Sequence, residues 1–349
     1  MPRLVTGCVF LLWVGCGVSA WAQVGSASGM QASPIDLLET ASRINRFLGT
    51  DVVPWHLRAT YAFLNEESKP KGGGTYEIFW GGPRKIKQSY ASKVFTQTDY
   101  LTETGLLRTG DMDWPAIIDQ RVFNNLFINF PARAVLEKLD LEATDRSILG
   151  VTLHCVEIQA RGGPRSQTAP TYCFDPGTPQ LRYASGLGRN VIEQQSATLL
   201  NALFLFRGHQ VSRDITVACQ GQPSLKIHID VLEDLPPNSD DLFKAPSDAL
   251  SPPPARQYID QLHMQARILK KSSPAFGISN QAALNVKGMM DVIIGKDGVV
   301  KSVRPIAGPS IYESDEVNSL RKQTYPPGLV NGAPVEVETE VGYVFTSRH

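Results

Sequence analysis

The sequence predicts an α+β protein, in which a curved antiparallel sheet packed against helices is followed by a small ββαβ domain. Three observations predict it. Apolar residues recur at helical spacing directly after Ser33. Trp55–Leu64 and Leu225–Val231 alternate between apolar and polar residues, as half-buried strands do. Between Gly288 and His349, two strand-like runs, a helix-like segment and a third alternating run follow in that order.

Residues 1–22 have the pattern of a secretory signal. Arg3 supplies the positive charge, Leu4–Val14 is largely apolar, and an A-x-A cleavage site ends at Ala22. The alternative is an uncleaved membrane anchor, because Leu4–Ala22 is close to the ~20 residues that a spanning helix needs. We expect cleavage, and hence an exported protein.

The composition is that of a globular protein without a strong charge. Hydrophobic residues make up 42 % and charged residues 19 % of the chain. Basic and acidic residues number 34 each. This balance argues against nucleic acid as a partner, because nucleic-acid binding needs a basic patch.

A proline-rich stretch divides the chain. Leu235–Asp241 and Ser251–Pro254 bracket a segment without periodicity, and their prolines hinder both helices and sheet ladders. We therefore expect a signal (1–22), a short flexible segment (23–33), a first domain (34–245), a proline-rich linker (246–258) that acts as a semi-rigid spacer, and a second domain (259–349).

The first domain is expected to begin with a helix that Ser33 caps and Gly49 ends. Gly72-Gly73-Gly74 is interpreted as a hairpin loop. Strands are expected at Trp55–Leu64, Gly74–Trp80, Lys85–Tyr90, Thr152–Ile158, Thr171–Phe174, Ile215–Cys219 and Leu225–Val231, with one or two helices within Ala116–Leu139.

Three cysteines remain after removal of the signal. In an oxidising compartment Cys155 and Cys173 form the natural pair, because their strands would make one hairpin. The alternative, a redox centre, lacks a C-x-x-C motif. Cys219 is then expected to be a buried small hydrophobe.

The sequence offers no pattern of catalytic chemistry. It has no G-x-S-x-G elbow and no phosphate-binding glycine motif, and its histidines are scattered. We expect neither an enzyme nor a cofactor or metal, with a hydrolase of unrecognised site as an alternative. Aromatic residues of the first strands are candidates to line an apolar cavity, with ordinary core as the alternative reading: Trp55, Tyr61, Phe63, Tyr76, Phe79 and Trp80.

In the second domain, Met289–Ile294 and Val299–Arg304 are expected to form a hairpin around a Gly-containing turn. Glu313–Lys322 opens with acidic and closes with basic residues, which favours a helix. Val335–Phe345 alternates as a strand. In this last strand Glu336, Glu338 and Glu340 are expected to face solvent together.

These residues resemble the C-terminal domain of TonB, the periplasmic energy transducer of Gram-negative bacteria. The resemblance rests on VIIGKDGVV (292–300), on NGAPV (331–335) and on the closing VEVETEV run. Gln323-Thr324 departs from it, because the family usually carries Trp there. The resemblance implies a periplasmic location and an edge that receives a strand from an outer-membrane or periplasmic protein. That candidate edge consists of Val335, Glu336, Val337, Glu338, Thr339, Glu340 and Val341, whose glutamates could instead only protect the edge from aggregation.

The first domain is similar, in its hairpin GTYEIFWGGPRKIKQSY (74–90) and in Tyr172–Pro176, to LolA/LolB-type periplasmic lipoprotein carriers. This resemblance implies a half-barrel that holds a lipid or lipoprotein acyl chain. The resulting expectation is a non-enzymatic periplasmic binding or adaptor protein. The alternative is a TonB-type energy transducer anchored in the inner membrane and facing the periplasm, which requires residues 1–22 to remain.

Overall fold

The computed structural model describes residues 33–345 except 49–52, 164–165, 167, 188–193, 261–262, 265–266, 270–285 and 309. The predicted signal at 1–22 lies outside the described residues. Among the helices that are described, none has both the length and the hydropathy of a transmembrane span.

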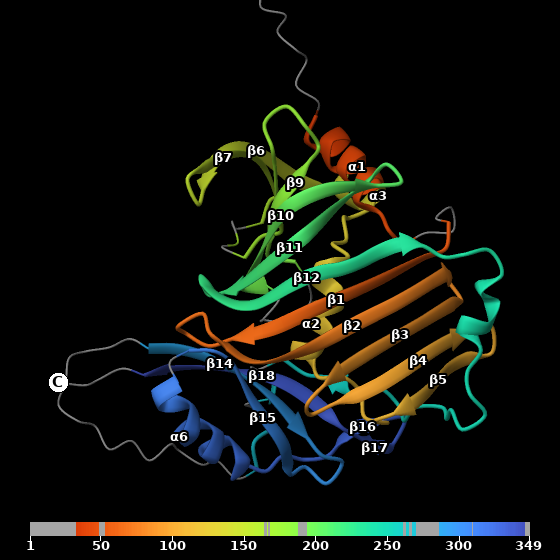
Figure 1. Cartoon of the computed structure of the whole chain (residues 1–349). Helices are drawn as coiled ribbons and strands as arrows, with labels where there is room; N and C mark the ends of the chain where they lie inside the picture. Colours follow the sequence, from red (N-terminus) through yellow and green to blue (C-terminus); the bar gives the residue numbers. More distant parts are fainter. Residues whose placement is uncertain are drawn as a thin grey trace, which may run out of the picture. The chain divides into compact units, whose positions relative to one another are not determined.

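The first part of the fold is an open sheet of twelve antiparallel strands (Figure 1). Its order is β5-β4-β3-β2-β1-β12-β11-β10-β9-β8-β7-β6, so two meanders join where β1 pairs with β12. The strands are β1 (Trp55–Leu64), β2 (Pro70–Gly82), β3 (Lys85–Ser92), β4 (Thr96–Thr102), β5 (Gly105–Gly110), β6 (Leu139–Ile148), β7 (Val151–Ala160), β8 (Thr171–Phe174), β9 (Leu181–Ser185), β10 (Ser196–Phe206), β11 (His209–Cys219) and β12 (Gln222–Asp234).

All seven predicted strands of this part are present, and the predicted antiparallel sheet is confirmed. The interpretation of Gly72–Gly74 as a hairpin loop is wrong. These glycines lie inside β2 and pair with β1. A Cβ atom on Gly73 would lie 2.2 Å from the carbonyl oxygen of Tyr61, so the close approach of the strands requires glycine there. The chain turns earlier, at Asn65–Ser68, where Ser68 has a φ of 60°.

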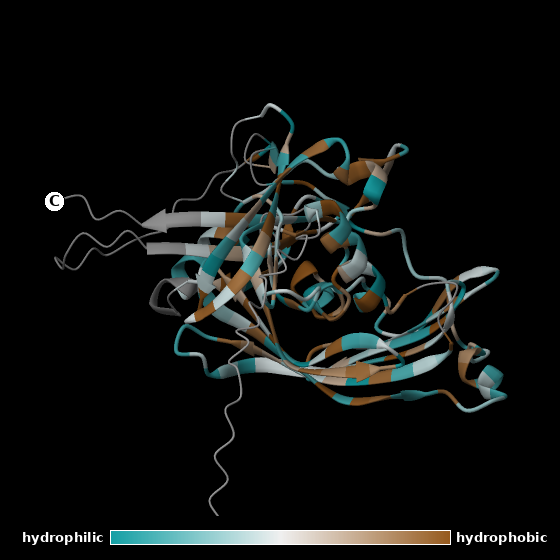
Figure 2. Cartoon of the chain, turned by 90° about the horizontal axis from the view of Figure 1, so that it is seen from above, coloured by the Kyte–Doolittle hydropathy of each residue, from teal (hydrophilic) through white to brown (hydrophobic). Residues whose placement is uncertain are grey.

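Three helices pack on one face of this sheet: α1 (Pro34–Asn45), α2 (Ile117–Leu126) and α3 (Arg133–Leu136). Ser33 caps α1 as predicted, since its hydroxyl accepts from the N–H of Asp36 at 3.2 Å. Figure 2 shows apolar and polar residues alternating along the strands. The apolar positions of β1 and β2 form the core with the helices, and Trp55 contacts Phe127 with ring centroids 5.8 Å apart.

The second part of the fold is a four-stranded sheet with the order β13-β18-β14-β15. Its elements are β13 (Gln257–Tyr258), β14 (Val286–Ile294), β15 (Val300–Ala307), the helix α6 (Ser310–Arg321) and β18 (Val337–Phe345). The short strands β16 (Gly328–Val330) and β17 (Ala333–Val335) pair separately, and a 3₁₀ turn, η1 (Ser239–Phe243), precedes this part. The predicted β-β-α-β order is confirmed.

Both faces of the four-stranded sheet are buried. Met290, Val292 and Ile294 pack in one apolar cluster with Leu320 of α6. Met289 and Ile293 point the other way, and they pack in a second cluster with residues 116–118 and Cys219 of the first part. The first part therefore packs on the face of this sheet that carries Met289 and Ile293.

The proline-rich segment is tied to the first sheet and is not a free spacer. Leu250 and Arg108 exchange two backbone hydrogen bonds, of 2.7 and 2.9 Å. The indole N–H of Trp114 donates to the carbonyl oxygen of Pro253 at 2.7 Å. The division into domains at residues 245 and 259 stays a prediction.

Candidate ligand cavities

Two cavities lie between the helices and the twelve-stranded sheet. The first, called here the Arg121 cavity, has a volume of about 800 Å³. Strands β8, β9 and β10 form one side of it, and α2 with the following loop forms the other. Its lining residues are Ile117, Gln120, Arg121, Asn124, Asn125, Ile128, Asn129, Phe130, Pro131, Pro170, Tyr172, Ala184, Ser185, Gly186, Leu187, Ser196, Thr198 and Tyr258.

The second cavity, called here the Phe47 cavity, has a volume of about 680 Å³. It lies between α1 and the loop that joins α2 to α3. Arg133 borders it and is held by carboxylates of Asp36 at 3.2 Å, Glu39 at 2.7 Å and Glu137 at 3.1 Å. Its lining residues are Glu39, Ser42, Arg43, Asn45, Arg46, Phe47, Leu48, Phe127, Ile128, Asn129, Phe130, Pro131, Ala132, Arg133 and His209.

One short segment, Ile128–Pro131, lines both cavities, and we call it the shared wall. Tyr172 of β8 fixes it in two ways. The Tyr172 hydroxyl donates to the carbonyl oxygen of Asn129 at 2.8 Å, and its ring stacks on Phe130 with centroids 4.8 Å apart. The two cavities thus share one loop segment, and Tyr172 contacts it by a hydrogen bond and by ring stacking.

The six aromatic residues predicted to line a cavity do not line either of these two. Trp55, Tyr61, Tyr76 and Trp80 are buried in the core behind them, and Phe63 is half-buried beside the core. Trp55 nevertheless supports the Phe47 cavity, because its ring contacts both Phe47, at 5.5 Å, and Phe127, at 5.8 Å. A ligand role for the six stays a prediction.

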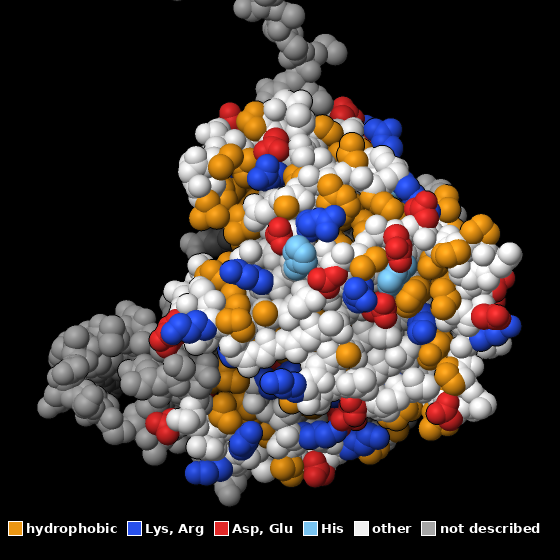
Figure 3. All heavy atoms as spheres, in the orientation of Figure 1, with side chains coloured by type: hydrophobic (Ala, Val, Ile, Leu, Met, Phe, Trp, Pro, Cys, Tyr) orange, Lys and Arg blue, Asp and Glu red, His pale blue; other side chains and the backbone are white. Residues whose placement is uncertain are grey.

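Phe79 lies on the opposite, outward face of the sheet, because it is one residue out of phase with Tyr76, Ile78 and Trp80. There it stacks on His56 with centroids 4.3 Å apart. His56 also bridges two carboxylates, Glu233 at 2.9 Å and Glu77 at 2.8 Å. Figure 3 shows acidic and basic side chains intermixed over this face, so it offers no single-sign patch to a partner.

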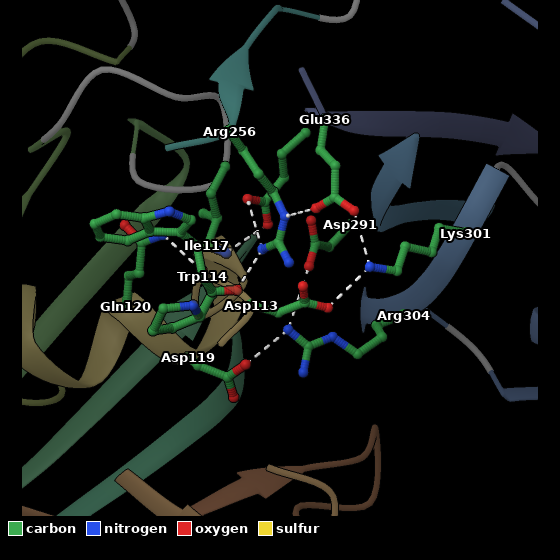
Figure 4. Close-up of polar contacts among 12 residues, drawn as sticks. Asp113, Trp114, Ile117, Asp119, Gln120, Arg256, Asp291, Lys301, Arg304 and Glu336 are labelled. Carbon is green, nitrogen blue, oxygen red and sulfur yellow. Dashed lines mark hydrogen bonds and ion pairs between the residues drawn. The ribbon is translucent and has the colours of Figure 1, made fainter. Parts of the chain in front are cut away.

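A buried polar cluster joins the four-stranded sheet to the start of α2 (Figure 4). Arg304 of β15 pairs with Asp119 of α2 at 2.8 Å and with Asp291 of β14 at 3.5 Å. Lys301 bridges Asp113 and Glu336, at 2.8 Å each. The pairs Arg304–Asp119 and Lys301–Asp113 link the two parts of the fold. The pairs Arg304–Asp291 and Lys301–Glu336 lie within the second part.

Glu338 and Asp291 are the most deeply buried acids of this cluster, with 3 % and 1 % of their surface exposed. Burial, together with the neighbouring carboxyl group of Asp291, raises the pKa of Glu338 to about 9. Burial also raises the pKa of Asp291. One Glu338 oxygen accepts from the backbone N–H of Ile117 at 2.6 Å. At neutral pH these two acids therefore carry less negative charge than their number implies.

The expectation that Glu336, Glu338 and Glu340 face solvent together is wrong. Glu338 and Glu340 are buried, and Glu336 is largely covered by its ion pairs with Arg256 and Lys301. The physical reason is that the first part of the fold covers this face of the sheet.

The candidate docking edge is only partly available for strand addition. β18 pairs along its whole length with β14, and Val337 and Glu338 pair on their other side with β13. Val335 pairs with Gly328 in the small β16–β17 sheet. Docking at Thr339, Glu340 and Val341 stays a prediction.

The predicted disulfide between Cys155 and Cys173 is confirmed. The two residues are direct partners on β7 and β8. Cys219 is a free, buried thiol, as expected, and burial raises its pKa. In the described part of the chain, no group of three or more His, Cys, Asp or Glu side chains is arranged to hold a metal ion.

No protein-family model and no curated protein matches this chain. Several solved structures are similar to it. A LolA-superfamily protein from Nitrosomonas europaea is 13 % identical with a TM-score of 0.39, and the match covers 62 % of this chain and 99 % of that one. A DUF1329-family protein from Desulfovibrio piger is 11 % identical with a TM-score of 0.35, over 60 % of this chain and 95 % of that one. Likenesses of this strength assign no family to the chain.

Proposed function

We propose that this chain is an exported, non-enzymatic binding protein that holds an apolar, acyl-chain-like ligand between its twelve-stranded sheet and helices α1 to α3. The observation that carries the proposal is the pair of cavities on either side of the shared wall. Their volumes, about 680 and about 800 Å³, lie in the range of small-molecule sites. A displaced wall would join them into one larger space.

The composition of the shared wall supports an apolar ligand. Ile128, Phe130 and Pro131 present apolar groups to both cavities. Tyr172 and Leu187 extend this surface in the Arg121 cavity, and Phe47 and Phe127 extend it in the Phe47 cavity. A ligand that fills such a space is stabilised by removal of apolar surface from water.

Export, and with it a periplasmic location, is supported by two features of the chain. Residues 1–22 carry the signal pattern. The disulfide between Cys155 and Cys173 would persist in an oxidising compartment and is rare in reducing ones. A ligand carried there would be accessible to the outer leaflet of the inner membrane or the inner leaflet of the outer membrane.

The test is equilibrium binding of palmitate and of hexadecanol to the purified chain beginning at Gln23. Asn124→Trp places a large ring at an exposed position that lines the Arg121 cavity, so it should obstruct entry without disturbing the core. Ser147→Trp, exposed on β6 and lining neither cavity, is the matched control. We expect wild type and Ser147→Trp to bind, and Asn124→Trp to bind at least about tenfold more weakly. Absence of binding of both ligands to wild type would refute the proposal.

A further inference from the structure

We propose that the Arg121 cavity selects amphiphiles with an anionic head, and that Arg121 binds the head. This inference rests on the proposed function and names the class of ligand. It concerns a single acyl chain that ends in a carboxylate or a phosphate, as opposed to an uncharged chain.

The charge of the cavity is the first argument. Of the eighteen described residues that line it, Arg121 is the one with a permanent charge, and none is Asp or Glu. The Arg121 side chain belongs to α2 and is buried, with 1 % of its surface exposed. A guanidinium group in such a low-dielectric position attracts an anion much more strongly than a surface arginine does.

The arrangement of polar groups around Arg121 is the second argument. Its Nη2 donates to the hydroxyls of Ser196, at 3.3 Å, and Ser224, at 3.1 Å. Asn125, one helical turn further on, accepts a hydrogen bond from the hydroxyl of Thr198. Ser196, Thr198 and Asn125 all line the cavity, so hydroxyl and amide groups surround the guanidinium. The Thr198 hydroxyl already donates to Asn125, but the second amide hydrogen of Asn125 can donate to an oxyanion.

The apolar side of the cavity is the third argument. Phe130, Pro131, Pro170 and Tyr172 line it with apolar groups, and Ala184 of β9 separates Tyr172 on β8 from Thr198 on β10. Polar and apolar groups therefore lie on different strands of one cavity of about 800 Å³. An amphiphile matches this segregation, with its head at Arg121 and its chain along the shared wall. With an uncharged ligand, the polar groups around Arg121 would have only water as an additional hydrogen-bond partner.

Two buried carboxylates contact lining residues, and Glu338 accepts the backbone N–H of Ile117 at 2.6 Å. Glu340 accepts a hydrogen bond from the hydroxyl of Tyr258 at 3.2 Å, and Tyr258 lines the cavity.

The experiment compares palmitate, lysophosphatidate with a palmitoyl chain, and hexadecanol by isothermal titration at pH 7.5. Wild type should bind palmitate, lysophosphatidate or both at least about tenfold more tightly than hexadecanol, the effect of one charge-assisted contact. Which of the two anions binds identifies the source of the head, a fatty acid or a phospholipid. Arg121→Gln should abolish this preference, and Arg121→Lys should retain most of it.

Equal affinity of wild type for all three ligands would overturn this inference and leave the proposed function standing. Binding of none of them would overturn both. The preference of the wild-type chain is measured without any substitution, so the test does not depend on Arg121→Gln folding. Far-UV circular dichroism and the melting temperature of each variant show which comparisons between variants are valid.

Discussion

The carboxyl group of Glu338, on the last strand of the chain, caps the helix that begins at Ile117. Its oxygen accepts the backbone N–H of Ile117 at 2.6 Å, and Ala116 at the N-cap has no side-chain acceptor of its own. Helix α2 leads directly into the shared wall of the two cavities. One buried acid therefore connects the last strand of the four-stranded sheet to the helix that precedes the shared wall.

Stability is expected to fall as the pH rises, because of this acid. Burial raises the pKa of Glu338 from 4.5 to about 9, so the folded chain binds a proton that the unfolded chain releases. The stabilisation is complete below about pH 4.5 and is lost as the pH approaches 9. The free energy of unfolding should decrease across this window by at most about 1.4 kcal/mol per pH unit for this group.

Glu338→Gln tests this assignment by urea denaturation at several pH values. Glutamine keeps an acceptor for the Ile117 N–H and does not titrate. The variant should therefore unfold with a smaller pH dependence between about pH 5 and about pH 9 than wild type. An unchanged slope would mean that Glu338 does not hold the proton, and Asp291→Asn would then be the variant to compare.

Glu336 is expected to show the opposite pH dependence. Burial would raise its pKa, but the hydrogen bonds from Lys301 and Arg256 lower it below 4.5. Its contribution is present above about pH 4.5 and is lost as the pH falls through the lowered value. Glu336→Gln should lower the free energy of unfolding at pH 7 by about 1 kcal/mol, because Lys301 is partly exposed. At pH 3 the difference from wild type should shrink, and a difference that grows in acid would contradict the assignment.

Much of the fold could be predicted from local patterns. The bounds of β1 were predicted to the residue, because apolar residues recur at every second position from Trp55 to Phe63 and pack in the core. By contrast, β4, β5, β6, β9 and β10 were missed. β4 (TQTDYLT) has few apolar residues. In β10 the apolar residues do not alternate with polar ones, and several of them are exposed or half-buried. Their strand form comes from pairing with neighbours, which no local pattern records.

The candidate site was less predictable for a related reason. The aromatic residues, except Phe79, were correctly placed between the sheet and the helices. A sequence pattern, however, does not distinguish an aromatic residue buried in a core from one that lines a cavity. The cavity residues Arg121 and Asn125 were passed over, because their importance depends on strands β8 to β10 closing against α2. The burial of Glu338 likewise depends on a contact between segments about two hundred residues apart.

Asp99→Asn is expected to destabilise the chain strongly. Arg108 and Asp99 are fully buried, with 0 % and 3 % of their side chains exposed, and they make two parallel contacts of 2.5 and 2.9 Å. The remaining Arg108 nitrogen donates to the carbonyl oxygens of Met112 and Asp113. Loss of the charge on Asp99 leaves a buried guanidinium without its counter-ion, at a cost of about 3–5 kcal/mol.

Urea denaturation of Asp99→Asn beside Glu103→Gln measures this difference. Glu103 pairs with Arg84 at 3.5 Å on the surface, where both side chains are more than two-thirds exposed. Its loss should change the free energy of unfolding by less than about 1 kcal/mol. Equal effects of the two substitutions would show that the buried pair contributes no more than a surface pair.

Reduction of the disulfide between Cys155 and Cys173 is expected to destabilise the chain by roughly 3 kcal/mol, the chain-entropy cost for a loop of this size. Unfolding in urea should therefore shift to lower denaturant when a reductant is added. The double variant Cys155→Ala/Cys173→Ala should not respond to reductant. Alkylation of the chain beginning at Gln23, unfolded without reductant, should modify Cys219 alone. Modification of three thiols would contradict the pairing.

Tyr172→Phe is expected to loosen the shared wall. The substitution removes the hydroxyl that donates to Asn129 at 2.8 Å but keeps the ring that stacks on Phe130. The cost should be about 1 kcal/mol in the free energy of unfolding. Amide hydrogen exchange should accelerate at residues 128–130 more than in the strands of the core, because the wall loses its hydrogen bond from Tyr172.

Tyr183→Phe is the matched control for this substitution. Tyr183 lies next to Ala184 on β9, but its ring packs on the opposite side of the sheet, against the disulfide. Loss of its hydroxyl should leave hydrogen exchange in the shared wall unchanged. If Tyr172→Phe leaves exchange there unchanged as well, the wall is held by packing alone, and joining of the two cavities would require displacement of the Phe130 ring.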